Sequence, residues 1–265
     1  MNDITLHLGD CAEVMQRLPD ASIDLTVTSP PYDNLRKYNG FVFDFESIAQ
    51  QLFRVTKLGG VVVWVVGDAT IDGSETGTSF RQALRFMEIG FNLHDTMIYE
   101  KNGMALPDNV RYFQSFEYMF IFSNRKPKAI NFLTDRKNRF LERWGKGQTV
   151  READGRMTER KRHIGNPYGR RFNIWRINGG YGYSAEEDYA YQHPAIFPEA
   201  LARDHILSWS NPGDMIFDPM MGSGTTGKMA VKYGRNFTGI EISEEYYAIA
   251  ERRIAEAKLQ IRMAL

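Results

Sequence analysis

The sequence has little of several features that would each mark a particular class of protein. Its single cysteine, Cys11, excludes an internal disulfide framework and a cysteine-based metal cage. Its 33 Lys and Arg balance 33 Asp and Glu, so net charge alone attracts neither nucleic acid nor membrane. The longest apolar run, residues 60–67, is too short to span a membrane, and the first ten residues do not resemble a signal peptide. We therefore expect a globular cytoplasmic protein that does not enter a membrane.

The zero net charge hides a strong asymmetry along the chain. Residues 124–176 hold 16 Lys and Arg but only 5 Asp and Glu, an excess of +11 that the rest of the chain offsets. A solvated surface could carry such charge. However, the excess is of one sign and is interleaved with aromatic residues, which favours nucleic-acid binding. These aromatic residues are Phe132, Phe140, Trp144, Tyr168, Phe172 and Trp175.

Outside a basic middle segment, apolar patterns of strand and helix type alternate along the chain. Strands are predicted at 4–8, 23–28, 61–66, 93–99, 117–122, 215–217 and 237–242. Helices are predicted at 11–18, 45–58, 79–89, 198–209, 225–233 and 244–263, and Gly59-Gly60 is expected to stop the second of these. Such alternation predicts an α/β fold with a doubly wound, mostly parallel sheet and helices on both faces.

A first candidate site, Thr28-Ser29-Pro30-Pro31-Tyr32, follows the strand predicted at 23–28. In open α/β sheets, ligands bind beyond the carboxyl ends of strands. The two prolines stiffen the backbone and remove two N–H donors, so carbonyl groups are left without local partners. Ser29 adds a hydroxyl and Tyr32 an aromatic face. Taken alone, the segment is equally compatible with an ordinary turn that ends a strand.

A second candidate site is the glycine-rich segment that begins at Asp218 and leads into the helix predicted at 225–233. Gly222 to Lys228 match most of a phosphate-binding loop, but Met229 stands where that motif needs Ser or Thr for magnesium. Asp218 would also repel phosphates and suits a cationic ligand better. Glu241, 23 residues further on, ends the next strand, where a carboxylate can bind a ribose diol.

These segments together resemble the DNA amino-methyltransferases, in the permuted order called the beta class, in which the catalytic motif precedes the cofactor motif. The resemblance covers nearly the whole chain and implies a seven-stranded, Rossmann-like methyltransferase sheet. It implies that S-adenosylmethionine is the cofactor and that the catalytic residues are Ser29, Pro30, Pro31 and Tyr32. The cofactor-binding residues that it implies are Asp10, Cys11, Phe197, Pro198, Asp218, Met220, Gly222, Ser223, Gly224, Thr225, Thr226 and Glu241.

The implied reaction is methyl transfer to an exocyclic amino nitrogen of a base flipped out of the duplex. The Ser29 hydroxyl and Pro30 carbonyl can accept the hydrogens of that nitrogen, and Tyr32 would stack on the base. In the family, a serine at the position of Ser29 favours N4 of cytosine as the methylated atom. N6 of adenine stays open as the alternative. Methylation of cytosine at C5 needs a reactive thiolate, and Cys11 is not in the Pro-Cys setting of such enzymes.

The expected domains are a catalytic domain, residues 1–123 and 192–265, and a target-recognition region, residues 124–191. The DNA-binding residues predicted in that region are Arg136, Lys137, Arg139, Arg160, Lys161, Arg162, Arg170 and Arg171. Double-stranded DNA is the expected partner, in a prokaryotic or phage-encoded setting. A homodimer and a cognate restriction endonuclease are further candidate partners.

Two other functions and several simpler residue roles stay open at this point. The same pocket could serve an RNA or protein amino-methyltransferase, or an inactive DNA-binding protein could keep the fold. Asp10 could only cap a helix, Cys11 and Phe197 could be core residues, and Gly67-Asp68 after a strand could contact substrate or form a turn. Asp218 could likewise cap a helix, Glu241 could lie at the surface, and His193 is expected to be structural.

Overall fold

The computed structural model describes residues 2–31, 43–103, 110–138, 148–160 and 166–264. The chain forms two compact units: residues 1–131 with 173–265, and residues 132–172. Among the described residues, the α-helices and the central sheet lie in the first unit, and the second unit contains short two-stranded ribbons. None of the described helices is long and apolar enough to cross a membrane.

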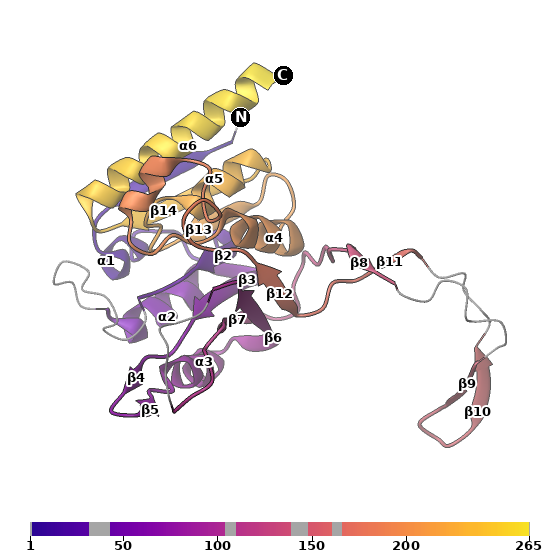
Figure 1. The fold of residues 1–265 in the computed structure, drawn as a ribbon. Helices are drawn as coiled ribbons and strands as arrows, with labels where there is room; N and C mark the ends of the chain where they lie inside the picture. The colour runs from indigo at the N-terminus through magenta and orange to yellow at the C-terminus, as the bar shows by residue number, and fades with distance from the viewer. Residues whose placement is uncertain (1, 32–42, 104–109, 139–147, 161–165, 265) are drawn as a thin grey trace. The chain divides into compact units, whose positions relative to one another are not determined.

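Eight strands form the central sheet of the first unit (Figure 1). In spatial order they are β1 (Ile4–Leu8), β14 (Asn236–Glu241), β13 (Met215–Asp218), β2 (Ile23–Thr28), β3 (Thr56–Val66), β7 (Phe116–Ser123), β6 (Asn92–Lys101) and β12 (Ile174–Ile177). All neighbours pair in parallel except β7, which is antiparallel to both β3 and β6. The predicted doubly wound, mostly parallel α/β sheet is confirmed.

Three helices cover each face of this sheet (Figure 1). One face carries α1 (Cys11–Met15), α2 (Phe45–Val55) and α3 (Thr78–Ile89); the other carries α4 (Glu199–Trp209), α5 (Thr225–Lys232) and α6 (Glu244–Ala264). A short ribbon of β4 (Thr70–Ile71) and β5 (Ser74–Glu75) and a 3-10 turn, η1 (Asp188–Gln192), complete the first unit. The sheet is therefore shielded from water on both sides.

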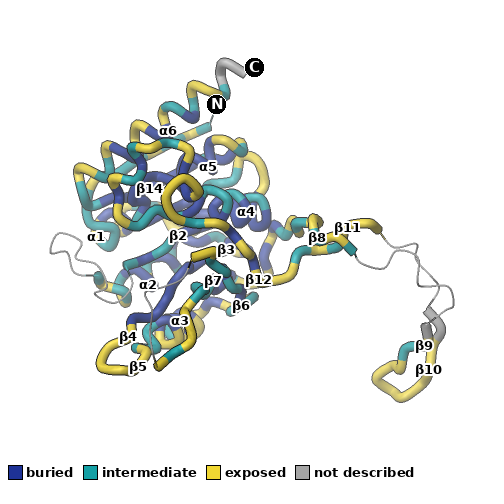
Figure 2. Tube along the Cα trace, viewed as in Figure 1, coloured by how far each residue is buried: buried dark blue, intermediate teal, exposed yellow. Residues whose placement is uncertain are grey.

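The central strands are largely buried because both of their faces are covered. Every residue of β2 is buried, and so is the run Val61 to Val66 of β3, which Figure 2 shows in dark blue. Beneath α2 and α3, an aromatic cluster around Trp64 and Phe86 fills the core, with ring centroids 5.1 Å apart. The buried Trp64 Nε1–H donates to Gln82 Oε1 at 2.9 Å, so the polar atom of the indole is satisfied.

The strand order reverses its direction between β13 and β2. The chain crosses from β13 through α5 on one face and from β2 through α2 on the other, so the two helices diverge at this point. Ligands of doubly wound sheets bind in the crevice that such a divergence opens at the carboxyl ends of the strands. The two candidate motifs of the sequence follow these two strands.

Three local predictions were wrong, the first being the helix predicted at 11–18, which ends at Met15. The helix predicted at 45–58 ends at Val55, and Gly59 and Gly60 lie inside β3 rather than stopping a helix, because pairing of Thr56 with Ile23 already draws the chain into the sheet. The sheet also has an eighth strand beyond the seven expected. Residues 174–177 pair in parallel with β6 and bury Trp175, so this tryptophan belongs to the core and not to a DNA-binding surface.

The second unit, residues 132–172, contains two short antiparallel ribbons. In one, β8 (Arg136–Lys137) pairs with β11 (Tyr168–Gly169); in the other, β9 (Gln148–Arg151) pairs with β10 (Met157–Arg160). The unit is narrower than the region predicted at 124–191, because the residues on both sides of it pack with the central sheet. That this region recognises the target stays a prediction.

Candidate active site

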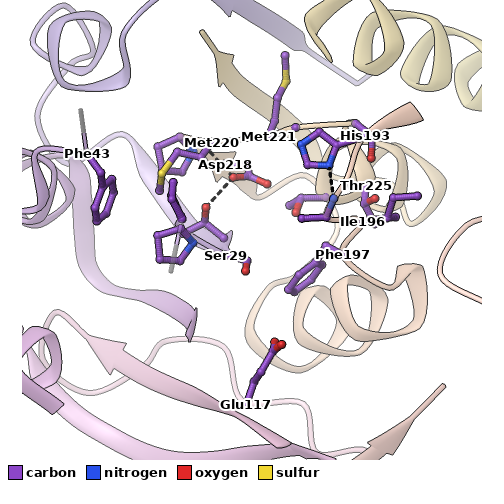
Figure 3. A pocket seen from close by; sticks show the side chains of 18 of the residues that line it. Ser29, Phe43, Glu117, His193, Ile196, Phe197, Asp218, Met220, Met221 and Thr225 are labelled. Carbon is purple, nitrogen blue, oxygen red and sulfur yellow. Dashed lines mark hydrogen bonds between the residues drawn. The ribbon is translucent and has the colours of Figure 1, made fainter. Parts of the chain in front are cut away.

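A cavity of about 1450 Å³ opens at the carboxyl edge of the central sheet (Figure 3). It brings together most residues of the two predicted motifs. Those lining it are Asp10, Cys11, Ser29, Pro30, Pro31, Phe197, Pro198, Asp218, Met220, Gly222, Ser223, Thr225, Thr226 and Glu241. Gly224 is not in the lining, and Tyr32 lies outside the described residues.

The Asp218 carboxyl joins the two motifs. It ends β13, is 5% exposed, and accepts hydrogen bonds from the Thr28 hydroxyl at 2.8 Å and from the Met220 N–H at 3.1 Å. Burial raises the pKa of Asp218 to about 7, and the nearby Glu241 charge adds to that rise. A carboxyl in this state ionises readily once a cation comes within reach, so the site favours a positively charged ligand.

The glycine loop is shaped by close packing against α6. Gly224 begins α5 with φ at +78°, and a Cβ there would lie 2.8 Å from the Ala250 Cα and Cβ. The buried Arg253 guanidinium of α6 donates to the Ser223 carbonyl at 2.7 Å and to the Thr225 hydroxyl at 3.1 Å. Gly224 therefore acts by letting the loop approach the helix, and Ser223 and Thr225 are held at the cavity wall.

The Glu241 carboxyl ends β14 and faces the same cavity. Its Oε2 accepts the Gly222 N–H at 2.8 Å, while Oε1 accepts the N–H groups of Ile242 at 3.0 Å and Ser243 at 2.9 Å. Burial nevertheless raises its pKa. Each carboxylate oxygen has further lone-pair capacity, so a ligand hydroxyl can still bind. Glu241 is 8% exposed and backbone N–H groups orient its carboxylate. It is therefore not a surface residue.

The Lys228 side chain excludes a phosphate-binding role for the loop. Its ammonium is buried and lies 3.1, 2.6 and 2.7 Å from the carboxylates of Glu186, Glu187 and Glu199. Arg253 shares two of these partners, Glu187 and Glu199, at 3.1 and 2.7 Å. In a phosphate-binding loop the lysine must reach the phosphates, whereas here it is held by three acidic groups.

The walls around the loop include residues with a structural role as well. Asp10 caps α1 by accepting from the Ala12 and Glu13 N–H groups at 2.8 and 3.2 Å, and it also lines the cavity. The His193 ring lies edge-on to Tyr246 at 4.4 Å between ring centroids and accepts the Ala195 N–H at 3.2 Å. Asp10 is therefore a helix cap that also lines the cavity, and its contact with the cofactor stays a prediction.

Cys11 and Asp68 do not act as catalytic groups. Burial raises the pKa of Cys11 to about 12, with a further rise from the Asp10 charge, so this thiol is not a nucleophile at neutral pH. The Asp68 carboxylate is 8% exposed and accepts the Ser79 N–H at 2.9 Å in the first turn of α3. Asp68 thus holds the start of α3.

The sequence reasoning missed a polar part of the cavity wall. Tyr99 and Lys101 near the end of β6, and Glu117 near the start of β7, line the cavity with Ser29 and Phe197, and Figure 3 shows Glu117 pointing into it. The alternation of polar and apolar residues along these strands was a signal. Only the pairing of the strands, however, places the three side chains together.

In the second unit, arginine side chains stack on exposed aromatic rings. The Arg136 guanidinium lies 4.6 Å from the Phe172 ring centre, and that of Arg170 lies 4.1 Å from the Phe132 ring centre. The Arg171 guanidinium is instead paired with Asp135. Lys137 is exposed and Arg160 belongs to β10. Arg139, Lys161 and Arg162 lie outside the described residues.

Fold and cavity together define a Rossmann-like methyltransferase. A family model described as DNA methylase, covering N6 and N4 enzymes, matches residues 23–252. The chain belongs to this family, and it is therefore a DNA amino-methyltransferase whose cofactor is S-adenosylmethionine.

Relatives of known name support the assignment. An orphan methyltransferase, M.BamHII of Bacillus amyloliquefaciens, is 60% identical over 90% of this chain and 91% of its own length. The type II methyltransferase M.SmaI of Serratia marcescens is 27% identical over 93% and 89% of the two chains. Among solved structures, a DNA modification methylase from Thermus thermophilus has a TM-score of 0.64, with 26% identity over 96% of this chain and 95% of that one.

Replacing Asp218 by Asn should stabilise the free protein in a pH-dependent way. The folded pKa of about 7 exceeds the ordinary 3.8, so the folded state binds the proton more tightly and wild-type stability falls as pH rises through that window. The advantage of Asp218→Asn should grow over the same window to on the order of a few kcal/mol. Urea denaturation between pH 4 and about pH 8 measures it.

Asp44→Asn is the matched control, because hydrogen bonds from Ser47 lower the pKa of Asp44. This variant should be less stable than wild type at neutral pH, and the difference should shrink in acid. A pH-independent difference for Asp218→Asn would contradict the assigned state of this carboxyl.

Gly224→Ala should lower the free energy of unfolding by about 1–3 kcal/mol through left-handed backbone strain and overpacking against Ala250. Gly213→Ala is the control, since Gly213 has a φ of +84° but no atom within 4 Å of a built Cβ. Chemical denaturation of both variants separates backbone strain from the clash. Equal losses would show that close packing on α6 is not what the loop requires.

Proposed function

We propose that this enzyme transfers the methyl group to N4 of a cytosine in double-stranded DNA, after the base has flipped out of the duplex. The observation that carries the proposal is the Thr28–Asp218 hydrogen bond of 2.8 Å, which sets the Ser29-Pro30-Pro31 segment against the glycine loop in one cavity. A methyl donor and a base amino group must meet in such a place, because in-line methyl transfer needs both reactants held in one geometry.

The donor set fits S-adenosylmethionine. We assign the buried Asp218 carboxyl to the cationic amino group of the cofactor, since burial leaves this acid in need of a positive partner. Glu241 would accept the ribose hydroxyls. The backbone around Gly222 would approach the methionine portion closely. The remaining assigned contacts are Asp10 and Cys11 at the adenine, and Phe197, Pro198, Met220, Ser223, Thr225 and Thr226 along the walls.

Chemistry at the base depends on hydrogen-bond acceptors. The lone pair of an exocyclic amino nitrogen is delocalised into the ring, so the nitrogen is a weak nucleophile. The Ser29 hydroxyl and the Pro30 carbonyl can accept its two hydrogens and favour a more tetrahedral nitrogen. Pro31 stiffens this segment, and Tyr32 is assigned to stack on the base. S-adenosylmethionine supplies the electrophilic methyl group on its sulfonium.

The choice of cytosine rests on Ser29, and adenine-N6 is the second candidate. A neutral hydroxyl at this position is the family's usual partner of cytosine-N4. Mass spectrometry of nucleosides from DNA treated with the enzyme separates the two products. N4-methylcytosine is expected, and methyladenine alone would overturn the choice of base. Single-molecule sequencing of DNA from cells that express the enzyme reports the base and the recognition sequence together.

Recognition of DNA is assigned to the basic region 124–191. Stacking of Arg136 on Phe172 and of Arg170 on Phe132 supports this, because it holds the guanidinium groups on exposed platforms. Lys137, Arg139, Arg160, Lys161, Arg162 and Arg171 are assigned to the same surface. For Arg171 the pairing with Asp135 offsets its charge, so we expect it to contribute less to phosphate binding than the others.

The biological setting follows from the relatives. Their names include an orphan and a type II methyltransferase, and their sources are bacteria, which supports a role in DNA modification in a prokaryote or phage. A cognate restriction endonuclease and a homodimer stay candidate partners, the homodimer on the family resemblance, and a cytoplasmic location stays a prediction from the cysteine content and the apolar pattern of the sequence. Sedimentation velocity of the purified enzyme tests the dimer.

Ser29→Ala should lower kcat by about a hundredfold or more, because it removes one acceptor at the reacting nitrogen. Binding of S-adenosylmethionine, measured by calorimetry, should stay within about twofold of wild type. Ser74→Ala is the control, since Ser74 lies on the exposed β5. A Ser29→Ala enzyme with unaltered kcat would overturn the catalytic assignment.

Replacing Lys137 and Arg170 by Gln should weaken DNA binding equally for all sequences and reduce the slope of log affinity against log salt by about one for each. The control is the joint change Asp154→Asn with Arg156→Gln, which removes an exposed ion pair and leaves the net charge unchanged. Fluorescence anisotropy with duplex DNA and matched RNA measures the slopes. An unchanged slope, or stronger binding of RNA, would contradict the assigned surface.

A further inference from the structure

The assigned cofactor and catalytic residues leave several parts of the cavity wall without a role. One of these parts consists of Tyr99, Lys101 and Glu117, which we call the polar wall. All three side chains line the same cavity as Ser29 and Phe197. An ion pair in the wall of a binding cavity presents a donor and an acceptor side by side, which is what recognition of a polar ring edge requires.

Strand pairing places the three side chains on one face of the sheet. Tyr99 of β6 lies directly opposite Glu117 of β7, so both point to the same face. Lys101 follows Tyr99 by two residues and therefore shares that face. Its ammonium lies 2.9 Å from Glu117 Oε1. The face is the one covered by α4, since His205 of α4 lies 3.1 Å from the sulfur of Met119, two residues after Glu117.

The antiparallel direction of β7 brings this group to the ligand-binding edge. Tyr118 pairs with Val66 at the carboxyl end of β3, and β3 in turn pairs with β2 up to Thr28. Glu117 therefore lies beyond the carboxyl end of β3, at the edge where Ser29 leaves β2. In Figure 3 the Glu117 carboxylate points into the space shared with Ser29 and Phe197.

Burial keeps the pair oriented while leaving it accessible from the cavity. The Lys101 side chain is 35% exposed and that of Glu117 is 17% exposed. Tyr99 is 4% exposed, and burial together with the Glu117 charge raises its pKa to about 12, so the phenol stays neutral. Two glycines, Gly179 and Gly180, continue the cavity wall beside this phenol, and a Cβ on Gly179 would lie 2.7 Å from the Tyr99 oxygen.

We propose that the polar wall reads the ring edge of the flipped base, with Lys101 donating to N3 and O2 of cytosine and Glu117 positioning the Lys101 ammonium. This inference rests on the proposed function, because it takes cytosine as the target. It makes Lys101 a specificity-determining residue and Glu117 a positioning residue that acts through Lys101.

The chemistry of the two candidate bases explains why such a wall discriminates. Beside its amino group, cytosine presents two neighbouring acceptors, N3 and O2. Adenine presents one acceptor, N1, followed by a C–H. An ammonium donor that spans two acceptors therefore loses a charged hydrogen bond on adenine. A bond of this kind contributes about tenfold to a hundredfold in discrimination.

The test compares wild type with Lys101→Met, Glu117→Gln and the double variant. The substrates are duplexes that carry the recognition sequence with either cytosine or adenine at the target position. We expect Lys101→Met to lower kcat/KM on cytosine by about tenfold to hundredfold, with a much smaller loss on adenine. Glu117→Gln should cause a smaller loss of the same kind. The double variant should be no worse than Lys101→Met, because Glu117 acts through Lys101.

Glu100→Gln is the matched control. Glu100 neighbours Lys101 on β6 but points to the other face of the sheet, where it pairs with Arg176 at 2.5 Å, and it is not in the cavity lining. This variant should keep the cytosine-to-adenine ratio of wild type. Thermal denaturation and calorimetry of S-adenosylmethionine binding confirm that each variant is folded and binds cofactor.

The possible failures are distinguishable. A wild type that yields only methyladenine would overturn the proposed function before any variant is measured. A wild type that yields methylcytosine, with Lys101→Met losing activity equally on both bases, would overturn the inference alone. Additive losses in the double variant would show that Glu117 does not act through Lys101 and would remove its positioning role.

Discussion

The buried carboxyl of Asp218 is the constraint on which the site depends. It ends one of the two paired strands at the switch in strand order, and the hydroxyl of Thr28 at the end of the other strand donates to it at 2.8 Å. A carboxyl removed from water is stable as an ion only beside hydrogen-bond donors and a cation. One interaction thus joins the two motifs, sets their spacing, and gives the cavity a preference for positive charge.

A second set of buried charges supports the glycine loop from behind. Lys228 and Arg253 share Glu187 and Glu199 in an interior that is almost closed to water. Arg253 also donates to the loop itself. Buried pairs of this kind add little net stability, but removal of one partner is costly because the other is left without compensation. The loop therefore has a defined position before any ligand binds, which favours a preorganised site.

Much of the fold and of the site could be predicted from residue patterns. β1 and β2 have the predicted bounds, because strand-forming residues predominate in both segments and residues that favour turns flank them. The glycine loop beside two acidic strand ends was recognisable as a candidate site from its residues. Three features could not be predicted from the sequence: the start of β3 at Thr56, the edge strand β12, and the polar wall of Tyr99, Lys101 and Glu117. Each of them depends on which distant strand lies alongside.

The sequence by itself determined the class of fold, the order of the two motifs and the chemical types gathered in them, since these follow from periodicity and from residues adjacent in the chain. Only the tertiary structure decided what each group can do. Burial raised the pKa of Asp218 and of Cys11, ion pairing turned Lys228 away from a phosphate role, and an antiparallel strand brought Glu117 to the cavity. Solvation and contact between residues far apart in sequence set these properties, and neither is encoded in local pattern.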